Sequence, residues 1–405
     1  MPPVDVSVVI PCLDEAATVG HVVKTVSEVL SSEGATFEVV VADNGSTDGS
    51  RAAAQAAGAR VVDASAVQGV GAATRAGVLA ARGMSVVLID ADGEHDATQI
   101  PTLLAALDGR PDAMVLGSRY LGGFDEGASS LPNRLLGTPT LTWLINNYFA
   151  TQITDCNTGF RAMAREVFLA LDVRATGFEF CSEMIARAAL LEVPIVEVPI
   201  QQRAGPPGRQ PHLRRLRDGW RHLKLILLHA PDRVLLRPGV VALVFGALMF
   251  FPQVKGRFVL GPILMDIHLM ILGALLLMVG VEMIGAGILC ATIAGAPVAP
   301  AGRISRRLGR HFSLDTMLPI AGFVFLLGLA ADIAVVVISA SQGWQGITES
   351  RLALVGTTAI AISTQILVLS FVHSVIDQHH AAAAHAPVEG VPSLTVQEAE
   401  ARETR

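Results

Sequence analysis

Four long apolar stretches near the C-terminal end constrain this 405-residue chain more than any other feature. A helix needs about 20 apolar residues to cross roughly 30 Å of hydrocarbon. Only 16% of the residues are charged, where soluble domains average about a quarter, which argues against a wholly soluble protein. The pattern predicts an α-helical transmembrane domain of about four helices in residues 238–376, with spans at residues 238–254, 268–294, 318–339 and 352–376.

Basic residues cluster beside these stretches and indicate their orientation. Residues 203–237 contain 9 Lys and Arg against 2 Asp and Glu, although the formal net charge of the chain is -6. A second group follows the second stretch: Arg303, Arg306, Arg307 and Arg310. Because short loops rich in Lys and Arg stay on the cytoplasmic side, we expect a multi-pass protein whose termini and N-terminal domain face the cytoplasm. Residues 377–405 lack apolar periodicity and predict a disordered cytoplasmic tail.

The segment that precedes the first stretch has its own pattern. In residues 212–237, leucines and Trp220 recur at helical spacing among arginines and Lys224. This predicts a basic amphipathic juxtamembrane helix suited to an anionic lipid bilayer surface. The alternative is a helix that packs on the soluble domain and exposes its basic face, and the two interpretations are compatible.

Residues 1–211 alternate short apolar runs with helix-like segments. The runs lie at residues 6–10, 37–42, 86–89 and 113–116. This alternation predicts an α/β domain with a largely parallel sheet, whose ligands bind beyond the carboxyl ends of the strands. Asp43 follows its strand directly and can hydrogen-bond a base or a ribose. We interpret Asp14 and Asp48 as helix N-caps.

The run at residues 86–89 is followed by four carboxylates within seven residues, in the sequence Asp90-Ala91-Asp92-Gly93-Glu94-His95-Asp96. Alternation along an extended segment sends Asp90, Asp92 and Glu94 to the same side. A hard cation such as Mg²⁺ or Mn²⁺ relieves the repulsion between such charges and keeps positions open for phosphate. An acidic turn without a metal is the alternative.

Several of these segments together resemble the family 2 glycosyltransferases of GT-A fold, a nucleotide-sugar-binding domain. The carrying motifs are Val8-Val9-Ile10-Pro11 with Glu15, Asp43-Asn44-Gly45-Ser46-Thr47-Asp48-Gly49 and Asp90-Ala91-Asp92. Further motifs resemble the polyprenyl-phosphate branch, which includes dolichol-phosphate mannose synthases: Gly117-Ser118-Arg119-Tyr120, Asp155-Cys156-Asn157-Thr158-Gly159-Phe160-Arg161 and Gly177-Phe178-Glu179-Phe180. The resemblance covers residues 4–237 and extends loosely into the membrane part.

The resemblance implies a role for each matching residue. The nucleotide sugar would contact Pro11, Glu15 and Asp43, while the metal site would comprise Asp90, Asp92 and Glu94. The arginines expected at the lipid phosphate are Arg119 and Arg134, and Arg203 is the one expected at the donor diphosphate.

Two positions depart from the family pattern. Glu94 replaces the usual glutamine and adds a negative charge to the metal site. The family's loop lysine is also missing, and Arg209 is the residue that could supply its positive charge to the diphosphate.

The resemblance implies a metal-dependent, inverting transfer of a single sugar from a GDP-mannose or UDP-glucose type donor to polyprenyl phosphate. The reaction would take place at the cytoplasmic face of the inner (plasma) membrane. A lipid phosphate is mostly dianionic at neutral pH and needs no strong base, so catalysis would rest on a cation and arginines. No nucleic-acid partner is expected, and a homo-oligomer stays open.

Two other functions are alternatives to single-sugar transfer. A processive membrane polysaccharide synthase also joins such a domain to membrane helices, but the chain lacks the Gln-x-x-Arg-Trp motif of those enzymes. A membrane transport or scaffold protein that only binds nucleotide sugar is the second alternative. The acidic cluster favours an enzyme over a protein that only binds nucleotide sugar.

Overall fold

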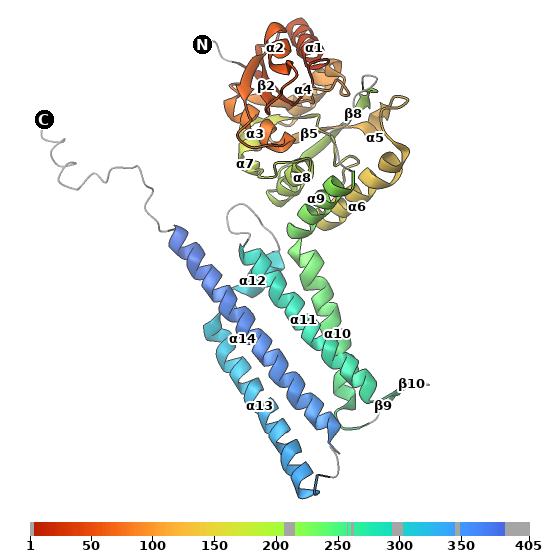
Figure 1. Cartoon of the computed structure of the whole chain (residues 1–405), viewed down its shortest axis with the longest axis vertical. Helices are drawn as coiled ribbons and strands as arrows, with labels where there is room; N and C mark the ends of the chain where they lie inside the picture. The colour runs from red at the N-terminus through yellow and green to blue at the C-terminus, as the bar shows by residue number, and fades with distance from the viewer. Residues whose placement is uncertain are drawn as a thin grey trace, which may run out of the picture. The chain divides into compact units, whose positions relative to one another are not determined.

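A computed structural model describes residues 4–205, 215–256, 258–260, 263–293, 303–344 and 349–384 (Figure 1). It divides the chain into two units, which we call the N-terminal unit (Met1–Val234 with Ala296–Arg303) and the helical unit (Leu235–Gly295 with Ile304–Arg405). The division separates the expected α/β domain from the expected membrane domain.

An eight-stranded sheet forms the centre of the N-terminal unit, in the order β3-β2-β1-β4-β7-β5-β8-β6. Its first four strands are parallel, β7 lies antiparallel between β4 and β5, and β8 and β6 follow parallel to β5. The four expected strands correspond to β1, β2, β4 and β5, so the predicted α/β fold is confirmed. The strands are β1 (Val6–Cys12), β2 (Phe37–Asp43), β3 (Arg60–Asp63), β4 (Ser85–Leu88), β5 (Met114–Ser118), β6 (Gly123–Phe124), β7 (Arg161–Ala164) and β8 (Ile195–Gln202).

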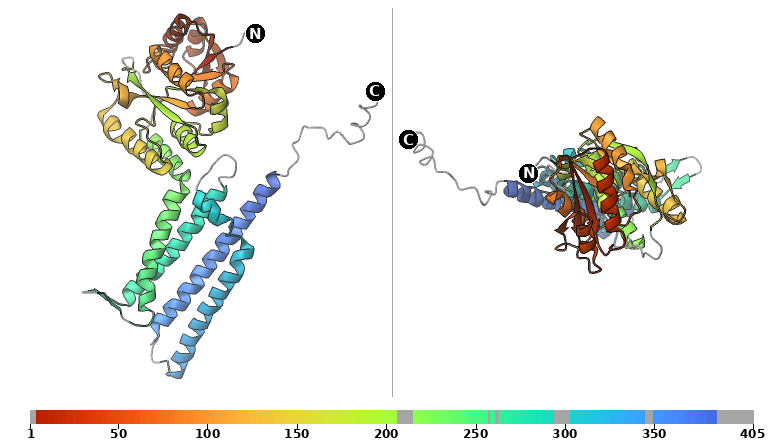
Figure 2. Two further views of the ribbon diagram at one scale, coloured as in Figure 1. Left: turned by 180° about the vertical axis from the view of Figure 1, so that it is seen from behind. Right: turned by 90° about the horizontal axis from the view of Figure 1, so that it is seen from above.

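Helices cover both faces of this sheet, because successive residues of a strand point to opposite sides (Figures 1 and 2). In β1, Val8 and Ile10 join a core with α1 and α4, whereas Val9 joins a second core with α3 and α8. Burial on both faces explains why the central strands are almost continuously apolar. The helices are α1 (Val19–Ser32), α2 (Ser50–Ala56), α3 (Val70–Ala80), α4 (Ile100–Gly109), α5 (Arg119–Gly122), α6 (Thr138–Phe149), α7 (Arg165–Leu171), α8 (Phe180–Leu190) and α9 (Arg215–Leu228).

Helix α9, in the expected juxtamembrane segment, packs against α6 and α8. Its buried face carries Asp218, His222 and Ile226, which are spaced four residues apart. The His222 Nδ1 lies 2.7 Å from the Ser182 Oγ of α8. Trp220 is exposed on another face. The helix therefore packs on the N-terminal unit and leaves an aromatic side chain and basic residues exposed, as the alternative interpretation expected, and its role at a membrane surface stays a prediction.

The described residues contain four helices long and apolar enough to span a membrane, and apart from residues 232–234 these helices lie in the helical unit. The candidate spans are Asp232–Gln253, Ile267–Ile293, Leu314–Ser341 and Ser350–His379, and each overlaps one expected stretch. The helices and short strands of this unit are α10 (Arg237–Phe250), β9 (Phe258–Leu260), β10 (Ile263–Met265), α11 (Ile267–Ile293), α12 (Arg303–Gly309), α13 (Leu314–Ser341) and α14 (Ser350–Ala384). Helix α14 continues beyond residue 376, where we expected the membrane domain to end.

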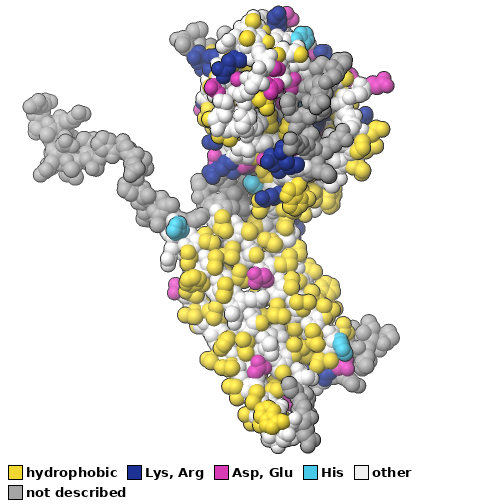
Figure 3. All heavy atoms as spheres, in the orientation of Figure 1, with side chains coloured by type: hydrophobic (Ala, Val, Ile, Leu, Met, Phe, Trp, Pro, Cys, Tyr) yellow, Lys and Arg dark blue, Asp and Glu magenta, His cyan; other side chains and the backbone are white. Residues whose placement is uncertain are grey.

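Small residues bring these helices close together. Helix α11 packs against α10 and α14, and α13 packs against α14, so the helices lie side by side (Figures 1 and 2). A Cβ added to Gly246 of α10 would lie 2.9 Å from the Gly273 carbonyl oxygen of α11, and one added to Gly328 of α13 would lie 2.8 Å from that of Gly356. Small residues at such crossings are typical of membrane helices. Hydrophobic side chains are spread over the face of the unit that Figure 3 shows.

Candidate functional site

The acidic segment begins at Asp90, with one residue between it and the end of β4, at the carboxyl edge of the sheet. An Asp90 oxygen lies 3.3 Å from the His95 Nδ1, and a Cβ on Gly159 would lie 2.7 Å from the same oxygen. His95 is buried, with its ring 5.5 Å from that of Phe160. Burial alone would lower the pKa of His95, but the carboxylates of Asp90 and Asp92 outweigh it and raise that pKa. The fold therefore packs Asp90 tightly between a glycine and a histidine.

Glu94 points toward β8. Its carboxylate accepts a hydrogen bond of 2.8 Å from the Gln202 Nε2, and its carbonyl oxygen accepts one of 2.8 Å from the Arg203 backbone N–H. Gln202 is only 4% exposed, and its Oε1 faces the Arg119 Nη1 at 3.4 Å. One amide side chain thus joins the acidic segment to the first of the expected phosphate arginines.

Arg119 is held by a buried acid, Asp155. Its Nε and Nη2 donate to the two carboxylate oxygens of Asp155 at 2.6 and 2.8 Å. Burial would raise the pKa of Asp155, but the guanidinium overcomes that effect and lowers it, so the acid is ionised. Such a two-point contact fixes the plane of the guanidinium. Arg119 therefore presents its remaining edge in a defined direction.

Phe124 brings the two expected phosphate arginines together. The guanidinium of Arg134 lies 4.6 Å and that of Arg119 lies 6.0 Å from the centre of its ring. The Tyr120 hydroxyl donates to the Arg134 carbonyl oxygen at 2.8 Å, which ties the two segments to each other. Large apolar side chains are exposed just before the π-helical turn η2 (Asn133–Gly137), within it and in α6: Leu131, Leu135, Leu136 and Trp143.

Arg203, the arginine expected at the diphosphate, lies beside the acidic segment. Its Nη2 is 2.6 Å from an Asp96 oxygen, and its backbone binds Glu94. The structure therefore places Arg203 next to the predicted metal residues. Arg209, the predicted substitute for the missing lysine, lies outside the described residues.

The expected nucleoside residues lie at the ends of β1 and β2. Pro11 is within β1, the Glu15 backbone N–H donates to the Ser50 Oγ at 2.8 Å, and Asp43 ends β2. The buried Asp43 carboxylate is bound by Arg51 of α2, which the sequence analysis had not singled out.

Neither Asp14 nor Asp48 is the N-cap residue itself, although Asp48 does accept from the free backbone N–H of Ser50, the first residue of α2, at 3.0 Å. Thr18 and Gly49 occupy those positions. Asp14 instead accepts from the Thr47 backbone N–H at 2.8 Å, and Asp48 accepts from that of Ala16 at 2.9 Å. The two aspartates brace the loops after β1 and β2 against each other.

The arrangement of carboxylates suits a cation held by two protein ligands. Within the described part of the chain, no three His, Cys, Asp or Glu side chains form a group that could hold a metal ion by themselves. Mg²⁺ commonly binds one or two carboxylates and takes its other oxygens from water and substrate phosphates. Asp90 and Asp92 are the two carboxylates expected at such an ion; an Asp90 oxygen lies beside His95 and an Asp92 oxygen accepts from the Glu94 backbone N–H at 3.0 Å. The Glu94 carboxylate accepts from Gln202.

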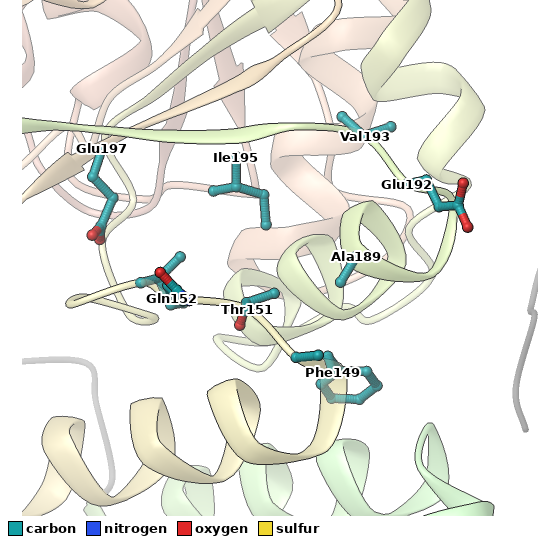
Figure 4. A pocket seen from close by; sticks show the side chains of 10 residues that line it. Phe149, Thr151, Gln152, Ala189, Glu192, Val193, Ile195 and Glu197 are labelled. Carbon is teal, nitrogen blue, oxygen red and sulfur yellow. The ribbon is translucent and has the colours of Figure 1, made fainter.

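A separate pocket of about 310 Å³ contains none of the predicted site residues (Figure 4). It is lined by the ends of α6 and α8 and the start of β8, including Glu197. The Glu197 carboxylate accepts hydrogen bonds from the backbone N–H groups of Thr154 and Asp155 at 2.8 to 3.1 Å. The pocket thus lies behind the loop that presents Asp155, apart from the polar cluster described above.

Four residues of the cluster had no role in the sequence analysis: Arg51, Phe124, Asp155 and Gln202. Asp155 lies within a quoted motif and Gln202 directly precedes Arg203. Their proximity in the sequence to residues with an expected role could therefore have pointed to both. Nothing in the sequence distinguishes Phe124 or Arg51 from other residues of their type.

Comparison with known proteins adds an independent finding. Residues 7–171 match the model described as glycosyl transferase family 2, and residues 289–377 match the glycosyltransferase family 2 C-terminal transmembrane region. The chain is 30% identical over 366 residues to the low-salt glycan biosynthesis hexosyltransferase Agl6 of Haloferax volcanii, a match that covers 90% of this chain and 87% of that protein.

Two further relatives match the N-terminal half. The dolichol-phosphate mannosyltransferase of Mycosarcoma maydis is 28% identical over 204 residues, covering 48% of this chain and 68% of the relative. The dolichyl-phosphate beta-glucosyltransferase of Drosophila melanogaster is 28% identical over 224 residues, covering 49% of this chain and 67% of the relative.

Proposed function

This chain belongs to glycosyltransferase family 2, and we propose that it transfers a single hexose from a nucleotide sugar to polyprenyl phosphate, with inversion at the sugar. Its N-terminal unit is the GT-A-like α/β domain of that family, and its four apolar helices make it a membrane protein. The names of two relatives, a mannosyltransferase and a glucosyltransferase that act on dolichol phosphates, support a GDP-mannose or UDP-glucose type donor.

The observation that carries this proposal is the arginine pair on Phe124 beside an exposed apolar surface. Arg119 and Arg134 supply positive charge around one ring, and Leu135, Leu136 and Trp143 are exposed in the adjoining turn and helix. A phosphate monoester suits the arginines, since guanidinium groups bind phosphate through two parallel hydrogen bonds. An isoprenoid chain suits the apolar side chains. A lipid phosphate combines both properties in one acceptor.

The donor side follows from the acidic segment and the ends of β1 and β2. We assign Asp90 and Asp92 to an Mg²⁺ or Mn²⁺ ion, which would neutralise the diphosphate leaving group. Arg203 would contribute positive charge beside it, and Arg209 is a further candidate. At the nucleoside we assign Pro11, Glu15 and Asp43. Glu94 is assigned to the metal only through the family pattern, because its carboxylate binds Gln202.

The chemistry needs few protein groups. An oxygen of the acceptor phosphate attacks the anomeric carbon, the bond from that carbon to the donor diphosphate oxygen breaks, and the nucleoside diphosphate leaves with the electron pair. One displacement inverts the anomeric configuration. Because the acceptor is already an anion at neutral pH, no proton has to be removed. The task of Arg119, Arg134 and Arg203 is to bring two anions together at a fixed orientation.

The basic segments support a location at the cytoplasmic face of the inner (plasma) membrane. Residues 203–237 carry an excess of seven positive charges, and four arginines lie between the second and third spans. Positive charge in short loops favours the cytoplasmic side. We therefore propose that the N-terminal unit is cytoplasmic.

The test uses the full chain in proteoliposomes with polyprenyl phosphate and a panel of radiolabelled nucleotide sugars. We expect one donor to give a lipid that carries a single sugar, and Arg134→Gln to lower kcat/KM for the lipid by about 10- to 100-fold. Arg110→Gln is the matched control, because Arg110 is an exposed arginine paired with Asp112 away from this cluster. Long polymer would favour a polysaccharide synthase, and no product with any donor would refute the proposal.

A further inference from the structure

Three parallel strands end in register at the edge that faces the expected nucleoside. Cys12 of β1 pairs with Asp43 of β2, and Asp43 pairs with Asp63 of β3. Ligands of such sheets bind just beyond these strand ends. Arg51, from the first turn of α2, reaches this edge. Its Nε and Nη2 lie 3.3 and 3.2 Å from one Asp43 oxygen, and its Nη2 lies 3.8 Å from an Asp63 oxygen.

The two side chains of this pair differ strongly in solvent exposure. The Asp43 side chain is 3% exposed, whereas that of Arg51 is 48% exposed. The other Asp43 oxygen accepts a hydrogen bond of 3.2 Å from the Ser46 backbone N–H, so the carboxylate is fixed on both sides. The more exposed partner is therefore Arg51, and its guanidinium lies against the nearly buried Asp43 carboxylate. At this edge, the N–H donors of the Arg51 guanidinium therefore lie next to the nearly buried Asp43 carboxylate, which is an acceptor.

Asp43 is already assigned to the nucleoside, and we propose that Arg51 is the residue that adds selection between bases, by binding the carbonyl oxygen next to the ring N–H; this inference rests on the proposed function. In uracil and guanine, a ring N–H lies next to a carbonyl oxygen. The N–H can donate to Asp43 while the carbonyl accepts from Arg51. Cytosine and adenine present an amino group next to an unprotonated ring nitrogen at the corresponding edge. Their donors would then face the guanidinium and their lone pair would face the carboxylate.

The expected discrimination follows from the cost of these mismatches. Hydrogen bonds to charged groups contribute enough to change affinity by about 10- to 100-fold each, and a mismatched base leaves both protein groups unpaired. The wild-type protein should therefore bind UDP or GDP at least about 10-fold more tightly than CDP and ADP. Removing the guanidinium should reduce that ratio, mainly by weakening the preferred nucleotide.

Titration calorimetry on the purified full chain tests this without any acceptor or turnover. The probes are UDP, GDP, CDP and ADP, each with Mg²⁺ or Mn²⁺, and the variant is Arg51→Gln. Arg60→Gln is the matched control, because Arg60 forms a similar ion pair of 2.7 Å with Glu38 at the opposite ends of β3 and β2. Thermal unfolding of both variants reports whether either has lost its fold.

Each outcome decides a different point. A preference for UDP or GDP that falls by at least about 10-fold in Arg51→Gln, but not in Arg60→Gln, supports the assignment. An unchanged preference in a folded Arg51→Gln variant overturns the role of Arg51 and leaves the proposed function intact. A wild-type preference for CDP or ADP overturns the selection of bases with a carbonyl oxygen next to a ring N–H. If the wild type binds none of the four, the proposed function fails together with the inference.

Discussion

Exchanging Glu94 and Gln202 tests whether the acidic segment and the acceptor arginine act as one hydrogen-bonded unit. The Gln202 amide donates to Glu94 over 2.8 Å and faces Arg119 with its oxygen. Gln202→Glu alone would place two carboxylates at that separation. At an effective dielectric constant of about 20, two unit charges 2.8 Å apart repel by about 6 kcal/mol.

Rotation or protonation of one carboxyl group relieves part of this repulsion. We expect a residual loss of at least about 2 kcal/mol in transition-state stabilisation, which corresponds to about 30-fold in kcat/KM. Glu94→Gln should cost less, because the side-chain oxygen of the introduced glutamine can still accept from Gln202. In the double exchange, the new carboxylate at position 202 can accept from the amide at position 94 and also face Arg119. The double variant should therefore recover to within about 10-fold of the wild type.

The assay is formation of the single-sugar lipid by the wild type, both single variants and the double variant, each over a range of Mn²⁺ concentrations. The double-mutant cycle should give a coupling energy of about 2 kcal/mol, with no change in the metal concentration needed for half-maximal rate. If Glu94→Gln raises that metal concentration and the double variant fails to recover, Glu94 is a metal ligand as the family pattern implies. The hydrogen bond to Gln202 would then be incidental.

Other variants probe the remaining parts of the molecule. Asp92→Asn should abolish lipid-linked product even with excess Mg²⁺ or Mn²⁺, and full activity would exclude the metal assignment. Phe124→Leu should lower kcat/KM for polyprenyl phosphate by about 5-fold, because both arginines lose their ring contact. The thermal unfolding midpoint should stay unchanged. An equal loss with every substrate would argue for a structural role of Phe124. Burial lowers the pKa of His222 from 6.5 to about 4, so between these pH values the unfolded chain binds more protons than the folded one. Stability is then fully present above about pH 6.5 and falls by about 3 kcal/mol as the pH drops toward 4, and His222→Gln should flatten this slope in thermal unfolding.

The sequence was sufficient to predict elements that depend on local pattern. The apolar runs of β1, β2, β4 and β5 and the four spans follow from hydrophobicity alone, since burial on both faces or in lipid demands it. The acidic segment was also visible, because like charges rarely crowd at a strand end without a ligand. Antiparallel β7 was not predicted. It is four residues long and begins with the buried Arg161, which breaks the apolar run that would identify a central strand.

Contacts across long sequence separations escaped prediction for a different reason. Gln202 meets Glu94 across 108 residues and Arg119 across 83 residues. The Arg119 contact depends on β8 lying beside β5, and the Glu94 contact depends on a bridge between His95 and Gln202. Polar side chains at strand ends carry no periodic signal that names their partners. Residue type therefore indicated which positions carry functional charges. Only the order of the strands showed which of these side chains contact one another. Because Gln202 touches both the acidic segment and the acceptor arginine, a change on one side of the site should alter substrate kinetics on the other side.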